Sequence, residues 1–345
     1  MDSSQPGGPA LEVPPGWAAR APVPEDVPAL VALLAGHQRW IKGSSSVDAD
    51  AVHSEVIGTG SWTRRHLVVT DADQQIQAWA TVHDRAAGRT SIAVTVGPDV
   101  QVGDRLAGSL FRWACETAQE VARERDQEST LLDASAIAGD ERQARWLTEA
   151  GLRRTRTWLQ MSRPVSAEEA SEDAFPAPRA GVVVRRVAQH EDGLPVAEDV
   201  RGVHLVLEES FADHFNSYRE SFPEFVARLR EDPGHRWDHW WLATVEGEGG
   251  PELAGAVVGS VLPEDAGGFE GSYIDYIGVH RRARGRGVAK ALLRTVIRDA
   301  AERGRNRVGL EVDADSPTGA DGLYQSMGWK TAYRTETWQR DIPAS

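Results

Sequence analysis

The stretch Gly278-Val279-His280-Arg281-Arg282-Ala283-Arg284-Gly285-Arg286-Gly287-Val288-Ala289 lies near the end of the chain, between an alternating run and an amphipathic run. Residues 273–279 alternate with the period of a strand, and apolar residues recur at helical spacing over 289–300. Glycines let the backbone come close to a ligand, and the N–H groups of a helix start favour anions. The stretch predicts a strand, an anion-binding turn and a helix start. We call residues 284–287 the glycine loop.

The residues on either side extend this pattern. Gly278 inside the predicted strand indicates a bulge or a close approach of a ligand. Residues 307–313 alternate again, which predicts a second strand. Ser316 and Pro317 predict the start of a short helix over 320–327, which Gly328 ends. The order of strands and helices predicts an α/β fold.

Three motifs in this order resemble the acyl-CoA core of the GNAT N-acetyltransferase superfamily: residues 279–287, Leu310-Glu311-Val312-Asp313 and Leu323-Tyr324-Gln325-Ser326-Met327-Gly328-Trp329. The resemblance implies an α+β mixed-sheet GNAT fold with a splayed sheet. It also implies acetyl-CoA as cosubstrate, with the pantetheine arm on the bulged strand and the pyrophosphate on the glycine loop. The implied contacts are Ile277, Val279, Arg282, Arg284, Gly285, Arg286, Gly287, Val288, Ala289 and Ser316. Ser316 stands where the family often has an asparagine.

Acyl transfer to an amine needs help with protons at both ends, because an alkylammonium titrates near pH ~10.4 and a thiol near ~8.5. Tyr324 resembles the family's general acid, which protonates the leaving thiolate. The backbone N–H of Ile277 or Val279 is the expected oxyanion donor. Asp275 and Glu311 are the two candidate bases, and a water chain without a dedicated base is the alternative.

The resemblance also implies that the substrate contacts lie in the helical segment between the first and second strands of this half. This segment mixes aromatic and acidic residues, which suits an organic amine but is equally typical of an amphipathic helix end. The candidates are Glu209, Phe211, Asp213 and His214. The histidines do not have the spacing of a metal site, so we expect no metal.

Composition narrows the class of partner. The formal net charge of −14 argues against nucleic acid, and no run of the sequence is long and apolar enough to span a membrane. Cys115 is the only cysteine, so no internal disulfide can form and a reducing, cytoplasmic location is expected. Arginine greatly outnumbers lysine, which favours a bacterial source. We expect a small-molecule amine as acceptor and a monomer or homodimer.

The sequence indicates the same fold twice. A shift of 182 residues aligns Gly103 with Gly285 and Ala107 with Ala289, and the helix residues that follow also correspond. The alignment puts Arg105 on Gly287, and Leu147 takes the place of Tyr324 at a slightly different spacing. We therefore expect the first copy to be degenerate. The predicted division is a disordered tail over 1–15, a degenerate GNAT-like domain over 16–163, a linker over 164–180 and a catalytic domain over 181–345.

Three hypotheses for the function remain at this point. The first is an acetyl-CoA-dependent N-acetyltransferase that acts on a small amine in the second half. Two tandem halves also resemble the mycothiol-synthase type, in which a cysteinyl amine is acetylated. The third hypothesis, from another class, is a non-catalytic acyl-CoA binding or sensing protein, although the presence of Tyr324 argues against it.

Overall fold

The computed structural model describes residues 11–85, 88–211, 220–316 and 319–345 and divides into two units. The first unit consists of Met1–Trp158 and Tyr333–Ser345, and the second of Leu159–Ala332. This division differs from the predicted one at the C-terminus. Nine residues from Thr335 to Pro343 pair with β5 of the first unit, so the last strand completes that sheet instead of the second one.

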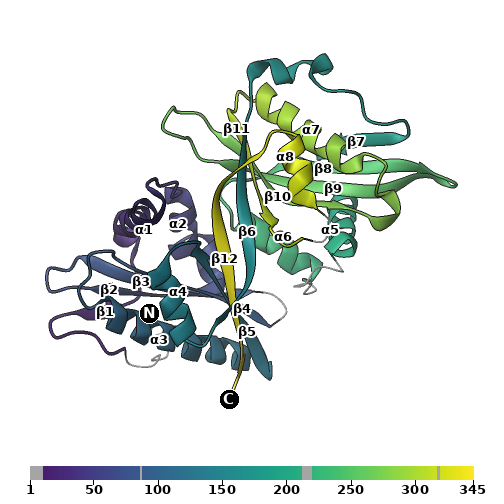
Figure 1. The fold of residues 1–345 in the computed structure, drawn as a ribbon. Coiled ribbons are helices and arrows are strands. Elements are labelled where there is room, and N and C mark those ends of the chain that lie inside the picture. The colour runs from purple at the N-terminus through teal and green to yellow at the C-terminus, as the bar shows by residue number, and fades with distance from the viewer. Residues whose placement is uncertain (1–10, 86–87, 212–219, 317–318) are drawn as a thin grey trace. The chain divides into compact units, whose positions relative to one another are not determined.

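The first unit has a sheet in the order β1-β2-β3-β4-β5-β12, with β4 and β5 parallel. Helix α3 packs on one face, and α1 with α2 packs on the other (Figure 1). The elements are β1 (Ala18–Arg20), η1 (Pro24–Asp26), α1 (Val27–Lys42), α2 (Ala49–Val56), η2 (Thr59–Thr63), β2 (Arg64–Thr70), β3 (Ile76–Arg85), β4 (Arg89–Val96), α3 (Gly103–Glu124), β5 (Ser129–Ile137), α4 (Glu141–Glu149), the first part of β6 (Arg153–Pro164) and most of β12 (Lys330–Pro343).

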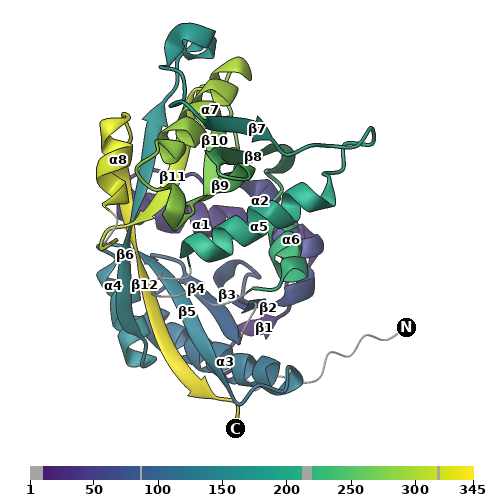
Figure 2. The same cartoon turned by 90° about the vertical axis from the view of Figure 1, so that its right-hand side faces the viewer.

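The second unit repeats this plan with the order β6-β11-β10-β9-β8-β7, and β10 and β11 are the parallel pair. Helix α7 covers one face of the sheet, and α5 with α6 covers the other (Figures 1 and 2). The elements are η3 (Ala167–Ala170), η4 (Glu172–Ala174), β7 (Val182–Arg186), α5 (Ala197–Phe211), α6 (Phe222–Arg230), β8 (His235–Gly247), β9 (Gly250–Leu262), β10 (Gly271–Val279), η5 (Arg281–Ala283), α7 (Val288–Glu302), β11 (Arg307–Asp313) and α8 (Ala320–Ser326).

Two segments expected to be irregular take part in the packing. Leu11 and Val13, inside the predicted disordered tail, pack against the core of the first unit. The predicted linker over 164–180 contains η3 and η4, and Phe175 packs against the core of the second unit. The acidic composition of this stretch predicts a linker, but its one aromatic residue packs against the core.

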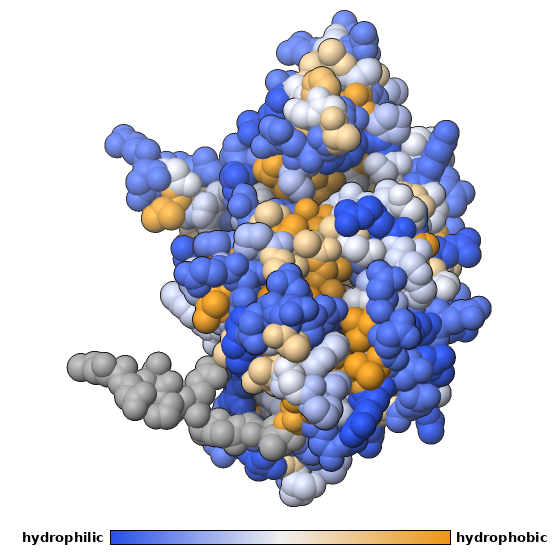
Figure 3. Space-filling view, turned by 90° about the vertical axis from the view of Figure 1, so that its left-hand side faces the viewer, coloured by the Kyte–Doolittle hydropathy of each residue, from blue (hydrophilic) through white to orange (hydrophobic). Residues whose placement is uncertain are grey.

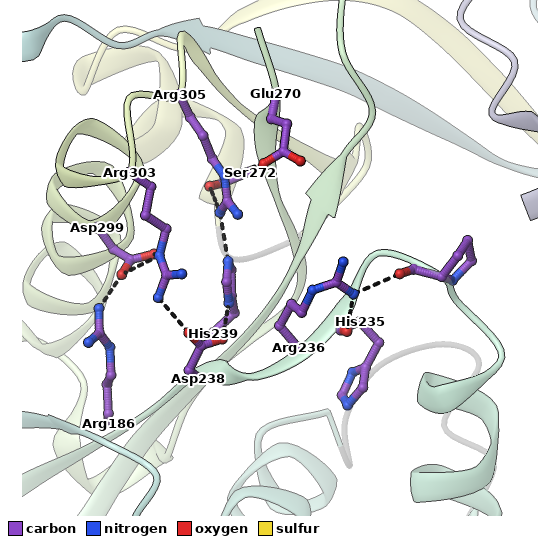
Figure 4. A network of polar contacts seen from close by, with 11 residues as sticks. Arg186, His235, Arg236, Asp238, His239, Glu270, Ser272, Asp299, Arg303 and Arg305 are labelled. Atoms are coloured by element: carbon purple, nitrogen blue, oxygen red, sulfur yellow. Dashed lines mark hydrogen bonds and ion pairs between the residues drawn. The ribbon is translucent and has the colours of Figure 1, made fainter. Parts of the chain in front are cut away.

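A network of buried charges joins β8, the end of α7 and the start of β10 (Figure 4). Arg305 Nη1 lies 2.6 Å from His239 Nε2, and the same group donates to the Ser272 hydroxyl at 3.0 Å. Because a guanidinium can only donate, Nε2 accepts, and the His239 proton is on Nδ1, 2.7 Å from Asp238. Burial lowers the pKa of His239, and the neighbouring Arg303 and Arg305 lower it further. The network therefore holds a neutral histidine and stabilises the edge of the sheet where β10 begins.

Charged and polar side chains cover most of the face drawn in Figure 3, with smaller apolar areas between them. This agrees with the 26% of charged residues in the chain. Within the described ranges, no helix is both long enough and apolar enough to cross a bilayer.

Candidate active site

The parallel strands β10 and β11 separate soon after they meet. They pair at only three positions, Ser272 with Val308, Tyr273 with Gly309 and Ile274 with Leu310. Beyond Ile274, β10 continues to Val279 and β11 continues to Asp313 without pairing to each other. We call residues 275–279 and 311–313 the open edges. Because the two strands no longer pair with each other there, an extended ligand can lie between them, as at the edge of a sheet.

A bulge in β10 lies at the point where the strands separate. Ile274 pairs with Gly259 of β9 and Tyr276 pairs with the next residue, Val258, so Asp275 is the extra residue. Ile274 packs in the core under α7, whereas Tyr276 packs with α5 and α6. The bulge thus places Asp275 and Tyr276 together on the α5/α6 face.

The sequence predicted a bulge or a close approach of a ligand at Gly278, and the structure places the bulge at Asp275 instead. Gly278 is in regular register with Ala256 of β9. A Cβ at Gly278 would lie 2.9 Å from Leu207 and from Ser210 of α5, so glycine is required there by the close packing of that helix.

Asp275 has an unusual environment for a carboxyl group. Its Oδ1 accepts a hydrogen bond from the Ser260 hydroxyl at 3.3 Å. Burial, together with the charge of Asp232, raises the pKa of Asp275 to about 7, against the opposing effects of Ser260 and Arg228. A carboxyl with a pKa near neutrality can take up a proton at physiological pH and release it again.

The glycine loop has the backbone conformation expected of an anion cradle. Gly285 and Gly287 have φ values of +78° and +87°, which side chains other than glycine rarely adopt. Gly287 is the N-cap of α7, and its carbonyl accepts the first helical bond, from Ala291, at 3.1 Å. The first N–H groups of α7 therefore have no acceptor within the helix. A Cβ at Gly285 would meet no heavy atom within 4 Å, so the space above the loop is open.

The arginines of the loop point in different directions. Arg286 Nη2 donates to the carbonyl of Glu246 at 3.0 Å, and Arg282 Nε lies 3.5 Å from a carboxyl oxygen of Glu252. Arg284 is exposed. Val288 is buried under the sheet and Ala289 is half-buried, so these two residues contribute their backbone and not their side chains.

Tyr324 lies on α8 with its ring in the core under α7. Only 7% of the residue is exposed, and its ring meets that of Trp329 edge to face at a centroid distance of 6.0 Å. Burial raises the pKa of Tyr324 to about 12, so the phenol stays protonated over the physiological range. Leu310 and Val312 of β11 belong to the same core, which places α8 against the open edge of β11.

Glu311 follows Leu310 on β11, as Asp275 follows its partner Ile274 on β10. The neighbours of Glu311, Leu310 and Val312, face the α7 core, so Glu311 and Asp275 both point to the other face. Gln160 Nε2 of β6 donates to the Glu311 carboxylate. The structure thus brings the two candidate bases to the same face of the sheet, one on each open edge.

The predicted substrate residues divide into two groups. Glu209 Oε2 lies 2.8 Å from His280 Nε2, which ties α5 to the end of β10. The ring of Phe211 lies edge to face with that of Tyr276 at 6.5 Å, next to the bulge. Asp213 and His214 lie outside the described residues.

Ser316 does not cap the last helix as the sequence predicted. The N-cap of α8 is Gly319, with a φ of +61° in the left-handed region that favours glycine. Ser316 instead lies in the turn after β11, where its N–H donates to the carbonyl of Asp313 at 3.2 Å.

The first unit lacks the glycine loop in a way that the alignment did not predict. Under the shift of 182, residues 103–105 correspond to residues 285–287, yet 103–105 are the first turn of α3. The helix therefore begins almost one turn earlier and carries Asp104 there, which accepts from the Trp146 indole at 2.8 Å. An acid at a helix start repels an incoming phosphate.

Arg142 fills the end of β4 in this unit. Its two Nη groups donate to the carbonyls of Val96 and Gly97 at 2.9 and 3.2 Å. The guanidinium also lies over the Trp40 and Trp146 rings, at 4.7 and 4.8 Å. The sequence did not point to Arg142, because the strand carbonyls and the Trp40 ring that it contacts lie about 45 and 100 positions away. An arginine at the start of α4 was the one sign of it.

Residues 206–329, inside the second unit, match the family model described as the acetyltransferase (GNAT) family. They form a GNAT domain. A GCN5-related N-acetyltransferase from Sphaerobacter thermophilus is 26% identical, with a TM-score of 0.72 over 96% of this chain and 98% of that chain. The second unit accordingly contains a domain of the GNAT acyltransferase type, a type that uses an acyl-CoA.

Two further structures share the fold at lower identity. A tandem GNAT protein from the clavulanic acid biosynthesis pathway is 15% identical, with a TM-score of 0.64 over 95% of this chain and 99% of that one. N-myristoyltransferase of Saccharomyces cerevisiae, solved with myristoyl-CoA, is 11% identical, with a TM-score of 0.54 over 98% and 80%. A tandem arrangement of GNAT folds is thus found in the protein of the clavulanic acid pathway.

Proposed function

We propose that this protein is an acetyl-CoA-dependent N-acetyltransferase of a small amine and that catalysis takes place in its second unit. The observation that carries the proposal is the pair of open edges with a different side chain on each face of the sheet. The bulge places Asp275 on the face covered by α5 and α6, and Tyr324 belongs to the core on the α7 face. An acyl thioester between the edges has a proton acceptor on one side and a proton donor on the other.

The residues around the open edges fit an acyl-CoA. The glycine loop offers N–H groups and open space to the pyrophosphate, and the backbone of Ile277 or Val279 offers an N–H to the pantetheine arm or to the developing oxyanion. Several arginines surround the loop, although the chain as a whole carries a net charge of −14. Positive charge is therefore concentrated where a phosphate would bind.

Asp275 and Tyr324 divide the proton transfers between them. Asp275, ionised above pH about 7, accepts the proton that the acceptor nitrogen loses as it attacks the thioester carbonyl. The carbon–sulfur bond breaks, and the Tyr324 hydroxyl donates its proton to the leaving thiolate. The products are the amide and the free thiol, and solvent restores both side chains. Phe211 and Tyr276 form an aromatic wall beside Asp275 that suits an amine with an apolar body.

A panel of amines with acetyl-CoA tests the proposed function. Release of free thiol, measured with a thiol reagent, is expected for at least one small primary amine, and the panel includes cysteinyl amines. Acetyl-CoA that binds while no acceptor in a broad panel releases thiol would instead support a binding or sensing protein.

Replacing Asp275 by asparagine is expected to lower kcat/KM about 10²-fold above pH 8, because an amide cannot accept the proton of the amine. In the wild type, kcat/KM is expected to rise with pH through about 7, because only the ionised carboxylate acts as base. In the variant, this rise of kcat/KM with pH, the ascending limb of the profile, is expected to disappear. The measurement is a pH profile with an acceptor whose own pKa lies above 9.

Asp232→Asn and Glu311→Gln are the matched controls. The charge of Asp232 raises the pKa of Asp275, so its removal is expected to move the limb to lower pH while the rate above pH 8 is kept. Glu311→Gln is expected to keep the limb in place. A limb that survives in Asp275→Asn and disappears in Glu311→Gln would assign the base to Glu311.

Titration calorimetry is expected to give about one acetyl-CoA per chain. Arg105→Gly in the first unit is expected to create no second site, because α3 still begins one turn early and Arg142 still fills the end of β4. A stoichiometry near two in the wild type would contradict the assignment of catalysis to the second unit alone.

A further inference from the structure

The segment over 164–181 follows α7 along its length, from the C-terminal end of that helix to its N-terminal end. Arg298 donates to the carbonyl of Glu172 at 3.0 Å, and Arg294, one turn earlier, donates to the carbonyl of Pro176 at 3.2 Å. In Figure 1 this stretch is the teal segment that leads from β6 to β7 past α7. The segment ends at the glycine loop, where its own arginine, Arg179, contacts the loop.

Arg179 contacts both glycines of the loop. Its Nη1 donates to the carbonyl of Gly285 at 2.7 Å. Its Cδ and Cγ lie 3.1 and 3.3 Å from the position of a Cβ at Gly287, so the side chain packs directly on that glycine. The residue is exposed, and this contact uses one of its five N–H donors. The guanidinium therefore lies at the rim of the cradle with donors to spare.

The arginines within the motif are less well placed for this purpose. The contacts of Arg286 with Glu246 and of Arg282 with Glu252 hold both guanidinium groups at the β8–β9 hairpin. Arg284 is exposed on the loop itself. Arg179 is thus an arginine outside the motif that the fold fixes against the backbone of the cradle.

We propose that Arg179 is a cofactor-binding residue that donates to the pyrophosphate of the acyl-CoA; this rests on the proposed function. A planar guanidinium suits phosphate oxygens because it can offer two parallel N–H groups. The hydrogen bond to Gly285 orients the group before the ligand arrives, so less side-chain freedom is lost on binding. The segment expected to be a linker then supplies part of the cofactor site.

Calorimetry with acetyl-CoA and with its dephospho form, which keeps the pyrophosphate and lacks the 3′-phosphate, tests the assignment. Arg179→Ala is expected to raise Kd about 10- to 100-fold for both ligands, as the loss of one or two charge-assisted hydrogen bonds would. Arg179→Lys is expected to recover only part of the loss. The thermal midpoints of both variants are expected to stay close to that of the wild type, since the side chain is exposed.

Arg294→Ala is the matched control, because it releases the same segment from α7 without removing a group from the cradle. It is expected to leave Kd within about 2-fold of the wild type. An unchanged Kd in Arg179→Ala, or an equal loss in Arg294→Ala, would overturn the assignment. A loss seen with acetyl-CoA but absent with the dephospho form would overturn the pyrophosphate as its target. If the wild type binds neither ligand, the proposed function fails together with this assignment.

Discussion

Replacing Gly285 by valine is expected to raise the Kd of acetyl-CoA at least ~10³-fold, the largest effect that a single substitution should have on binding. The side chain would occupy the open space above the loop, where the pyrophosphate must approach the N–H groups of α7. Several charge-assisted hydrogen bonds would be lost together. Calorimetry of the purified variant measures the effect directly.

Gly304→Val provides an unusually close control. Gly304 has a φ of +72° against +78° at Gly285, and a Cβ at either position meets no heavy atom within 4 Å. The two glycines flank opposite ends of α7, so the backbone strain of about 1–3 kcal/mol is similar while the distance from the cradle differs. We expect both variants to lose similar thermal stability and only Gly285→Val to lose binding.

Equal affinities in the two valine variants would remove the glycine loop from the cofactor site. A loss of affinity in both would assign the effect to strain in α7. Only a selective loss at Gly285 supports a cradle that depends on close approach of the backbone.

The local parts of this site are readable from the sequence. The alternation over 273–279, the glycines at 285 and 287 and the helical spacing that follows each depend on residues a few positions apart. The structure accordingly has β10, a glycine loop with positive φ values and α7 at these places. The motif was enough to locate Tyr324. The structure shows in addition that the ring is buried next to Trp329, and this burial raises the pKa of Tyr324.

The parts that depend on pairing between distant segments are not readable in this way. A bulge is a count of residues on two strands, so Asp275 could be recognised as the extra residue only once β9 and β10 were in register. Its pKa is raised first by burial among distant segments and then by the charge of Asp232, which is 43 positions away in the sequence. Gly103 shows a further limit, because it aligns with Gly285 yet is helical, and an aligned glycine does not determine its own conformation.

Replacing Tyr324 by phenylalanine is expected to lower kcat about 10²- to 10⁴-fold at neutral pH and to leave the Kd of acetyl-CoA near that of the wild type. The ring keeps its contact with Trp329 and its place in the core, so only the proton donor is removed. Steady-state kinetics of thiol release, with calorimetry for binding, separates the two effects.

The pH dependence of this defect distinguishes an acid from a packing residue. Above pH ~8.5 the thiolate can leave without a proton, so the ratio of wild-type to variant kcat is expected to fall as pH rises. Because burial raises the pKa of Tyr324 to about 12, the wild-type phenol remains a donor throughout this range, and the convergence must come from the variant. Equal rates at neutral pH, with chemistry shown to be rate-limiting by single-turnover measurements, would reduce Tyr324 to a core residue. A defect of constant size from pH 6 to 10 would indicate that the phenol positions the thioester and does not protonate its sulfur.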